Sequence, residues 1–356
     1  MPPPRVIHVV RRYGPVGGME RYVWELTRAL AQAGHAVTVV CERRHAEGPP
    51  GVAVHELGEI APRPRWLSLL RFSRRVRRWF EAHPAGDALI HSHERLDCHH
   101  LTTFHGPPFA TIFERAWWRR CSLRVAMQLR LERRELLAPG VRAVVPNSPL
   151  IREQLLRYYP AAAARLTAPI PPGVSPGPAR PPRAVPADGG VIGFVGREWR
   201  RKGLDHAVAV AAALRARRPN VELWVAGPPP QEVAPLFAGW TGGYRLLGWA
   251  SDFSLYPRFD LLLHPARAEP YGMVVAEAMA ARVPVVISDA CGIAPDVTAN
   301  AGQALSLAAP VQEWAAACER QLARGAPPPA FRRRWDVVAQ EYAALYRRLA
   351  GVRGTD

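Results

Sequence analysis

The sequence is almost devoid of lysine. Of its 47 basic residues all but Lys202 are arginine, and only 30 acidic residues oppose them, so the formal net charge is +17. A protein this basic commonly binds nucleic acid, anionic lipid or a phosphorylated substrate. No RNA-recognition, zinc-finger or helix-turn-helix pattern accompanies the charge. A basic nucleic-acid-binding protein is therefore an alternative that no motif favours, and we expect no nucleic acid partner.

Cysteine is also scarce, and long apolar runs are missing. The five cysteines are Cys41, Cys98, Cys121, Cys291 and Cys318. They form no Cys-x-x-Cys pair, which argues against a zinc or disulfide framework and predicts a reducing cytosol. No run of about 18 apolar residues could cross a membrane, and the first ten residues lack the apolar core of a signal peptide. The 356 residues are enough for two domains.

The most informative stretch, residues 260–289, reads as strand, loop, helix and strand. Residues 260–264 and 283–288 are short apolar runs, as expected for buried parallel strands. Pro265 and Pro270 keep the segment between them out of a helix, because the residue before a proline is pushed away from the α region. This order predicts a βαβ unit with a functional loop at its centre.

Two carboxylates stand out in this stretch, Glu269 in the loop and Glu277 in a helix expected over residues 272–281. If Gly272 opens the helix, the free backbone N–H groups there attract a phosphate or a sugar oxygen. Glu277 then lies roughly 8 Å further along the axis. An anion site with an acceptor carboxylate at each end fits a sugar nucleotide, although an alanine-rich helix with one polar glutamate is by itself ordinary.

The amino-terminal residues predict a second βαβ unit. Strands over 5–10 and 36–40 flank a helix over 19–33, and Gly17 and Gly18 come just before that helix. The glycines do not form the G-x-G-x-x-G pattern, so a nicotinamide site gains little support. They permit either a plain tight turn or a close approach of the backbone to phosphate.

Histidine gathers in one short region. The histidines are His91, His93, His99, His100 and His105. Their spacing would permit a metal site, but no carboxylate or cysteine pattern accompanies them, and we expect no metal.

Two segments are rich in arginine and aromatic residues. Residues 63–80 hold seven arginines and no acid, and residues 109–137 read as a long helix. Basic amphipathic helices of this kind lie on anionic membrane surfaces. The alternatives are helices packed on the first domain with a solvated face, or arginines that hold phosphates of a substrate. The membrane-surface candidates are Arg71, Arg74, Arg75, Trp117, Trp118, Arg119, Arg120 and Arg124.

The spacing of Glu269 and Glu277, with Pro-Tyr-Gly after the first and Glu-Ala-Met-Ala at the second, resembles the signature of the retaining glycosyltransferases of family four. Gly17-Gly18, the basic loop at 196–203 and residues 170–174 are similar to other parts of that family, so the resemblance covers nearly the whole chain. The closest similarity is to lipopolysaccharide core glucosyltransferases, through 262–266 and 286–292. The first domain looks more like the general family, which leaves the acceptor open.

The resemblance implies an α/β protein of the GT-B fold, two doubly wound Rossmann-like domains facing a central cleft. We expect an acceptor-side domain at residues 1–170 and a proline-rich linker at 171–189. A nucleotide-sugar domain follows at 190–330. A last helix at 331–349 is expected to pack back on the first domain.

The resemblance also implies a function. It predicts metal-independent, retaining transfer of a hexose from a nucleotide-diphosphate sugar, a UDP-sugar being expected, to a cell-envelope glycan or glycolipid such as lipopolysaccharide core. No cofactor is expected. An acceptor of this kind would keep the enzyme on the inner face of the cytoplasmic membrane. The alternative within the same fold is a sugar-nucleotide epimerase.

The residues that match the family receive roles by the same resemblance. Glu269 would hold sugar hydroxyls, Glu277 the ribose, and Arg197 with Lys202 the leaving diphosphate; the alternative for this loop is a solvated basic surface. The implied catalytic residues are His105, Arg197, Lys202 and Glu269. The implied donor-binding residues are Gly17, Gly18, Arg197, Lys202, Glu269, Gly272, Met273, Val274 and Glu277.

Overall fold

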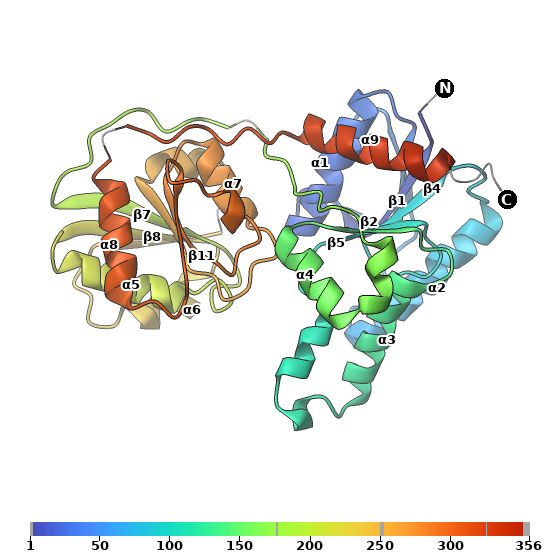
Figure 1. Ribbon diagram of the computed structural model, residues 1–356, viewed down its shortest axis with the longest axis horizontal. Helices are drawn as coiled ribbons and strands as arrows, with labels where there is room; N and C mark the ends of the chain where they lie inside the picture. Colours follow the sequence, from blue (N-terminus) through green and yellow to red (C-terminus); the bar gives the residue numbers. More distant parts are fainter. Residues whose placement is uncertain (1–2, 176, 250–252, 325, 352–356) are drawn as a thin grey trace. The chain divides into compact units, whose positions relative to one another are not determined.

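The computed structural model describes residues 3–175, 177–249, 253–324 and 326–351. The chain divides into two compact units, residues 1–173 with 334–356 and residues 174–333 (Figure 1). Each unit is built on a six-stranded parallel sheet flanked by helices. The doubly wound α/β architecture that the sequence predicts is confirmed for each unit. Among the described residues, no helix is long and apolar enough to cross a membrane.

The first unit has the strand order β3-β2-β1-β4-β5-β6. Its strands are β1 (Val6–Tyr13), β2 (Val37–Arg44), β3 (Val52–Glu56), β4 (Leu89–Ser92), β5 (Leu101–Phe104) and β6 (Ala143–Pro146). Its helices are α1 (Gly18–Gln32), α2 (Arg65–Ala82), α3 (Leu123–Leu137), α4 (Pro149–Tyr158) and α9 (Trp335–Gly351). The strand order reverses between β1 and β4, and open sheets of this type bind ligands beyond the carboxyl ends of the strands at such a point.

Two details of the first sheet differ from the sequence prediction. β1 continues to Tyr13, beyond the strand predicted over residues 5–10, so Arg11 and Arg12 belong to the strand. The edge strand β3 is not predicted at all. It is half exposed along its length and lacks the continuous apolar run by which a buried parallel strand is recognised.

The long helix expected over residues 109–137 is broken. Two short 3₁₀ segments, η1 (Phe109–Glu114) and η2 (Trp117–Arg119), precede α3. The backbone is extended at Arg115 and again at Ser122. Arg120 donates hydrogen bonds to the carbonyls of Phe113 and Arg115, and the Ser122 hydroxyl accepts from Val125 N to cap α3. Side-chain bonds to the backbone therefore replace the helix that composition alone favours.

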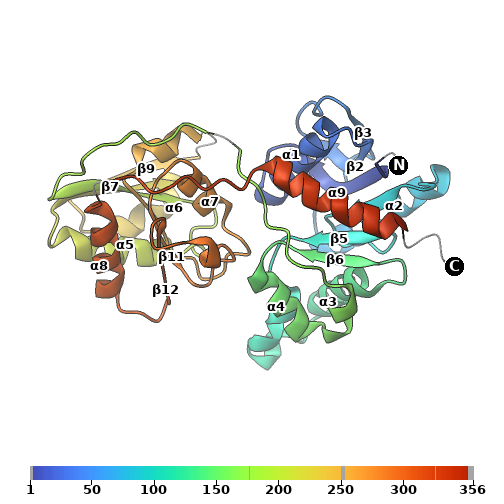
Figure 2. The same cartoon turned by 45° about the horizontal axis from the view of Figure 1, so that its top comes forward.

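The last helix, α9, belongs to the first unit and lies beside α1 (Figures 1 and 2). Its tyrosines reach the sheet. The Tyr342 hydroxyl lies 2.8 Å from that of Tyr22 and 2.7 Å from Thr103 Oγ1, and Tyr346 lies 2.8 Å from His91 Nδ1. Because these groups are buried, each hydrogen bond satisfies a polar atom that would otherwise be costly.

The second unit has the strand order β12-β11-β10-β7-β8-β9. Its strands are β7 (Gly189–Val195), β8 (Asn220–Ala226), β9 (Tyr244–Gly248), β10 (Leu261–His264), β11 (Val285–Ser288) and β12 (Gly302–Leu305). Its helices are α5 (Leu204–Arg215), α6 (Pro230–Val233), α7 (Met273–Ala280) and α8 (Val311–Leu322). The strand order reverses between β7 and β10, which places the loops after those two strands at the expected binding edge.

The segment predicted as a linker, residues 171–189, is not a separate linker in the structure, because residues from 174 onward group with the second unit. Arg180 donates to Asp260 Oδ1 at 2.8 Å and Arg183 Nε to the same oxygen at 2.9 Å. Asp260 Oδ2 accepts from the backbone N–H of Val191 at 2.9 Å. A buried carboxylate thus fixes the proline-rich segment to the first strand of its sheet.

Candidate functional site

Glu269 is the centre of a charged group in the second unit. It lies in the loop between β10 and α7, and its backbone bonds to the loop after β11 through Ala290 and Gly292. The residue is only 9% exposed. Its Oε2 lies 3.0 Å from Lys202 Nζ, 3.4 Å from His264 Nε2 and 3.5 Å from Arg201 Nη1. The structure therefore brings the two predicted residues Lys202 and Glu269 together.

The carboxyl group of Glu269 is held in its ionised form. Burial alone would raise its pKa, but the positive charge of Lys202, with His264 and Arg201 beside it, outweighs burial and holds the pKa well below its ordinary value. A hydrogen bond with His264 contributes to this lowering. The cations of Lys202 at 3.0 Å and Arg201 at 3.5 Å thus keep the carboxylate ionised.

Lys202 reaches Glu269 because the residue at 196 has no side chain. Gly196, the first residue of the loop between β7 and α5, has a φ of +154°, and a Cβ there would lie 2.0 Å from Lys202 Cδ. The Lys202 backbone N–H donates to Glu198 O at 3.0 Å. A glycine is therefore required for the lysine side chain to cross the loop on its way to Glu269.

Arg197 is not part of this charged group. Its side chain is exposed, whereas Arg201, which the sequence reasoning missed, donates to Ala268 O at 2.5 Å and lies beside Glu269. Arg201 directly precedes Lys202, so its position in the basic loop was the available signal. His264, at the end of β10, was also missed as a neighbour of Glu269. Arg197 stays a candidate as an exposed cation of the loop between β7 and α5.

The amino end of α7 lies directly after the Glu269 loop. Gly272 is the N-cap with a φ of +113°, and no side chain caps the helix. Met273 and Val274 are in the first turn, where backbone N–H groups have no acceptor within the helix. Glu277, in the second turn, is 9% exposed and accepts a hydrogen bond from Tyr256 at 2.5 Å. The structure thus places donors and a second acceptor carboxylate along one helix, as the sequence predicts.

Gly17 and Gly18 begin α1 in the first unit. Gly17 is the N-cap in an extended conformation, with a φ of −160°. A Cβ at Gly17 would meet only the Glu20 side chain, and a Cβ at Gly18 would meet nothing within 4 Å. The fold therefore leaves room for a side chain at Gly18, whereas a side chain at Gly17 would displace the buried Glu20 carboxylate that pairs with Arg12.

A pocket of about 900 Å³ lies in the first unit at the carboxyl ends of its strands. Seven arginines contribute to its wall, namely Arg11, Arg12, Arg43, Arg63, Arg65, Arg95 and Arg124. Five glutamates also line the pocket. Glu20, Glu42 and Glu59 pair with Arg12, Arg11 and Arg43, and burial raises the pKa of Glu94 to about 7 and that of Glu135 to about 8. The arginines outnumber the ionised carboxylates. The pocket therefore suits an anionic ligand.

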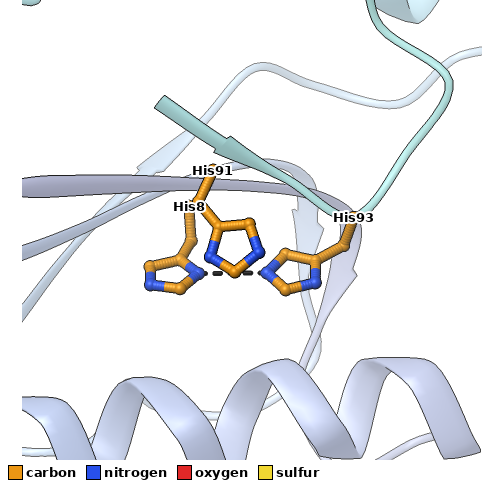
Figure 3. Close-up of side chains that lie close together, drawn as sticks. All are labelled: His8, His91 and His93. Atoms are coloured by element: carbon orange, nitrogen blue, oxygen red, sulfur yellow. Dashed lines mark hydrogen bonds between the residues drawn. The ribbon is translucent and has the colours of Figure 1, made fainter. Parts of the chain in front are cut away.

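His105 lines the same pocket and lies in a group of buried histidines. His105 Nε2 lies 2.9 Å from His93 Nδ1, and His93 Nε2 lies 3.0 Å from His8 Nδ1 (Figure 3). The sequence reasoning missed His8, because one histidine inside a strand carries no local pattern. Burial lowers the pKa of His8 and of His105 to about 3, so both rings are neutral at pH 7.

The described part of the chain contains one group of side chains close enough to hold a metal ion, His8, His91 and His93, with ligand atoms within 4.8 Å of one another. Five of their six ring nitrogens already have hydrogen-bond partners, since His91 contacts Tyr346 and Thr103. A metal ion would have to displace several of these bonds. The residues present therefore fit a hydrogen-bonded group better than a metal centre.

The structure contradicts a membrane role for the apolar side of α2. Leu69, Phe72 and Val76 are buried in the first unit, so the predicted alternative of a surface helix is the correct one here. Arg71 and Arg74 are exposed, but Arg75 donates to the carbonyls of Leu57 and Gly58 and is tied to the fold.

The second basic segment keeps its apolar groups in solvent. Trp117 is 69% exposed and Trp118 is 64% exposed. Phe113 and Leu123 are also exposed large apolar residues. Arg119 and Arg124 are exposed as well, whereas Arg120 is occupied by backbone carbonyls. An exposed aromatic cluster of this kind marks an interaction surface.

Two family models match the chain. The model described as "Glycosyltransferase Family 4" matches residues 16–177, and the one described as "Glycosyl transferases group 1" matches residues 189–324. Among curated proteins, the D-inositol 3-phosphate glycosyltransferase of Arthrobacter sp. (strain FB24) is 28% identical in an alignment 327 positions long, which covers 79% of this chain and 76% of the relative. The matched residues include the Glu269 loop and, in the pocket of the first unit, His93 and His105.

Solved structures with a similar fold include WaaG, a glycosyltransferase involved in lipopolysaccharide biosynthesis. It has a TM-score of 0.78 at 20% identity and covers 99% of this chain and 100% of its own. The Anabaena protein HepE, in complex with UDP and glucose, has a TM-score of 0.66 at 17% identity. The match covers 96% of this chain and 99% of the HepE chain. Together with the family matches, these similarities show that the chain is a glycosyltransferase of the GT-B fold and belongs to glycosyltransferase family 4.

Proposed function

We propose that this glycosyltransferase moves a hexose from a UDP-sugar, with retention at the anomeric carbon and without a metal ion, to a hydroxyl of an anionic cell-envelope glycan or glycolipid. The observation that carries the proposal is the group around Glu269. Two neighbouring loops bring together an ionised carboxylate and two cations. The uncapped amino end of α7 follows directly after the Glu269 loop. A donor sugar with its diphosphate offers hydroxyls to the carboxylate and negative charge to the cations.

The leaving group is stabilised by Lys202, by Arg201 and by the amino end of α7. Negative charge develops on the diphosphate as the glycosidic bond breaks, and fixed positive groups lower the energy of that state. Lys202 is paired with Glu269 before the donor binds. A diphosphate that enters the site competes for the lysine, and the carboxylate is released to accept hydrogen bonds from the sugar. These cations perform a task that Mg²⁺ has in other transferases.

Glu277 and Tyr256 bind the ribose of the donor. Tyr256 donates to one carboxylate oxygen of Glu277 and orients this carboxylate, which accepts from a ribose hydroxyl when the donor binds. In the first unit, His105 contacts the reacting sugar. A phosphate oxygen of the donor takes the proton of the acceptor hydroxyl, so no protein side chain has to act as the base. HepE, a protein of similar fold, is solved with UDP and glucose, which supports a UDP-sugar as the donor.

The acceptor binds in the pocket of the first unit. Of the seven arginines there, Arg63, Arg65 and Arg124 make no hydrogen bond or ion pair with the described residues. Charge-assisted bonds to phosphate are the usual role of such arginines. The curated relative from Arthrobacter is named for an inositol phosphate acceptor, which supports an acceptor that carries phosphate. A phosphorylated glycolipid, such as lipopolysaccharide core, satisfies this requirement.

The exposed segment around Trp117 and Trp118 binds the inner face of the cytoplasmic membrane. Tryptophan prefers the interface between lipid and water, and each nearby cation adds about 1 kcal/mol on an anionic surface. This contact would hold the enzyme where a lipid-linked acceptor is found.

A donor screen tests the proposal. UDP-, ADP- and GDP-glucose are incubated with the protein in EDTA, with and without D-inositol 3-phosphate as an anionic acceptor probe, and the release of nucleoside diphosphate is measured. We expect release of UDP that persists in EDTA and rises with the phosphorylated probe, but not with unphosphorylated inositol. Turnover that is abolished by chelation and restored by Mg²⁺ would contradict the metal-independent mechanism.

A further inference from the structure

Three histidines of the first unit form a continuous hydrogen-bonded chain that ends in the pocket. From the pocket inward, His105 Nε2 meets His93 Nδ1 at 2.9 Å, and His93 Nε2 meets His8 Nδ1 at 3.0 Å. His93 is 4% exposed and His8 is fully buried. Figure 3 shows the rings of His8 and His93 joined by the hydrogen bond, with His91 between them in the view. The chain links a pocket residue to the centre of the sheet.

The direction of the protons along this chain follows from its buried end. A neutral imidazole has one N–H and one acceptor nitrogen, so the two bonds must point the same way along the chain. His8 Nε2 is buried and has no partner among the described residues. If the protons pointed inward, this atom would be a buried N–H without an acceptor, and such orphan donors are rare. If the protons point outward, His8 Nε2 carries no proton and is only an acceptor without a donor.

The outward direction fixes the tautomer of His105. His8 Nδ1–H donates to His93, His93 Nδ1–H donates to His105 Nε2, and the proton of His105 must lie on Nδ1. That nitrogen makes no hydrogen bond with the described residues and is not among their fully buried polar atoms. It is the atom that His105 can offer to a ligand in the pocket. All three rings are neutral at pH 7, because burial lowers the pKa of each.

We propose that His8 and His93 are positioning residues that hold His105 as the Nδ1–H tautomer, so that it acts as a neutral hydrogen-bond donor to a sugar oxygen and not as a base. The inference rests on the proposed sugar transfer for the identity of the ligand, but the tautomer is a property of the protein alone. His91 stands outside the chain, since its two nitrogens contact Tyr346 and Thr103.

The tautomer is measured directly by two-bond ¹H–¹⁵N correlation spectra of the protein labelled with ¹⁵N-histidine. The signals of His105 are assigned by comparison with His105→Asn. We expect the Nδ1–H pattern for His105 in the wild-type protein between pH 6 and 8. An Nε2–H pattern, or an imidazolium that titrates in this range, would overturn the proposal. This measurement needs no substrate, so it remains decisive if the proposed reaction is wrong.

Variants at the buried end separate positioning from mere packing. His8→Leu removes the first donor, so His105 should populate both tautomers and kcat/KM for the donor sugar should fall about 5-fold, as expected for one oriented hydrogen bond. His8→Asn provides an N–H close to the position of Nδ1 and should restore both the spectrum and the activity. His99→Gln, a change at a buried histidine outside the chain, is the control and should leave both unchanged.

Two results would contradict the role of the chain. Equal loss of activity in His8→Leu and His8→Asn, with the His105 spectrum unchanged in both, would show that His8 acts only by packing. Stoichiometric zinc in the purified protein, detected by mass spectrometry, would mean that the imidazole lone pairs serve a metal instead. If His8→Leu fails to fold, the wild-type spectrum and His8→Asn still test the tautomer.

Discussion

Lys202 Nζ lies 3.0 Å from Glu269 Oε2, so the single lysine of the chain is paired with the first glutamate of its most specific motif. Both side chains are nearly buried, and a charge pair removed from water persists only when its partners are well placed. The pair links the loop after β7 to the loop after β10. If the donor binds here as proposed, it must displace this existing ion pair.

We expect Lys202→Met to lower kcat by about 10- to 1,000-fold, because the leaving diphosphate loses about 1.5–4 kcal/mol of stabilisation. Removal of the lysine also withdraws the main charge that depresses the pKa of Glu269, so this pKa should rise. Steady-state assays of nucleotide release measure the first effect. Arg217→Met, which breaks an exposed pair with Glu319 elsewhere in the unit, is the control and should change kcat less than twofold.

Glu277 and Glu269 should affect different kinetic parameters. Tyr256→Phe removes the bond at 2.5 Å that orients Glu277, so it should raise the KM for the donor about 5-fold with little change in kcat. Glu277→Ala should raise the same KM further. Glu269→Gln should act mainly on kcat, because the proposed role of Glu269 is to hold the reacting sugar. Equal effects of the Glu269 and Glu277 changes on both parameters would be evidence against separate roles.

Asp260 should be among the most important polar residues for the stability of the second unit. Asp260→Ala leaves the buried guanidinium of Arg180 without its partner, and an uncompensated buried charge costs about 3–5 kcal/mol. Urea unfolding followed by circular dichroism measures the loss in the free energy of unfolding. The control is Asp188→Ala, at an exposed aspartate whose side chain accepts a hydrogen bond from Asn220; it should cost less than about 1 kcal/mol. A cost below this value for Asp260→Ala would contradict the anchoring role.

Membrane binding should depend on the tryptophans of the second basic segment. In co-sedimentation with vesicles that contain anionic lipid, the wild-type protein should pellet at low salt and be released as salt screens the arginines. Trp117→Ala with Trp118→Ala should weaken the pelleting at least several-fold, because both rings are exposed. Arg71→Gln with Arg74→Gln is the charge control on α2, whose apolar side is buried, and should have a smaller effect. Wild-type protein that stays in the supernatant at low salt would refute the membrane assignment.

Much of the second unit could be predicted from sequence because its signals are local. Buried parallel strands such as β10 and β11 read as continuous apolar runs, and Pro265 and Pro270 mark the loop between β10 and α7. Loops after adjacent parallel strands share one edge of the sheet, which is why Lys202 and Glu269 could be expected near each other.

The features that were missed depend on contacts between distant segments. β3 is an edge strand without a distinctive apolar run, and the break before α3 depends on side-chain bonds such as those of Arg120. His8 acquires its role only when β1 is placed beside β4. The position of Arg201 beside Glu269 was also missed, because the direction of a side chain in an irregular loop cannot be read from spacing.

The anomeric configuration of the product tests the central claim most directly. With the UDP-sugar that the donor screen selects, for example UDP-α-glucose, the linkage formed on the acceptor is read from the coupling constant of the anomeric proton by NMR, in EDTA. The account predicts an α-linked product and continued turnover without metal. A β-linked product, or no sugar transfer to any phosphorylated acceptor with any nucleotide sugar, would contradict it.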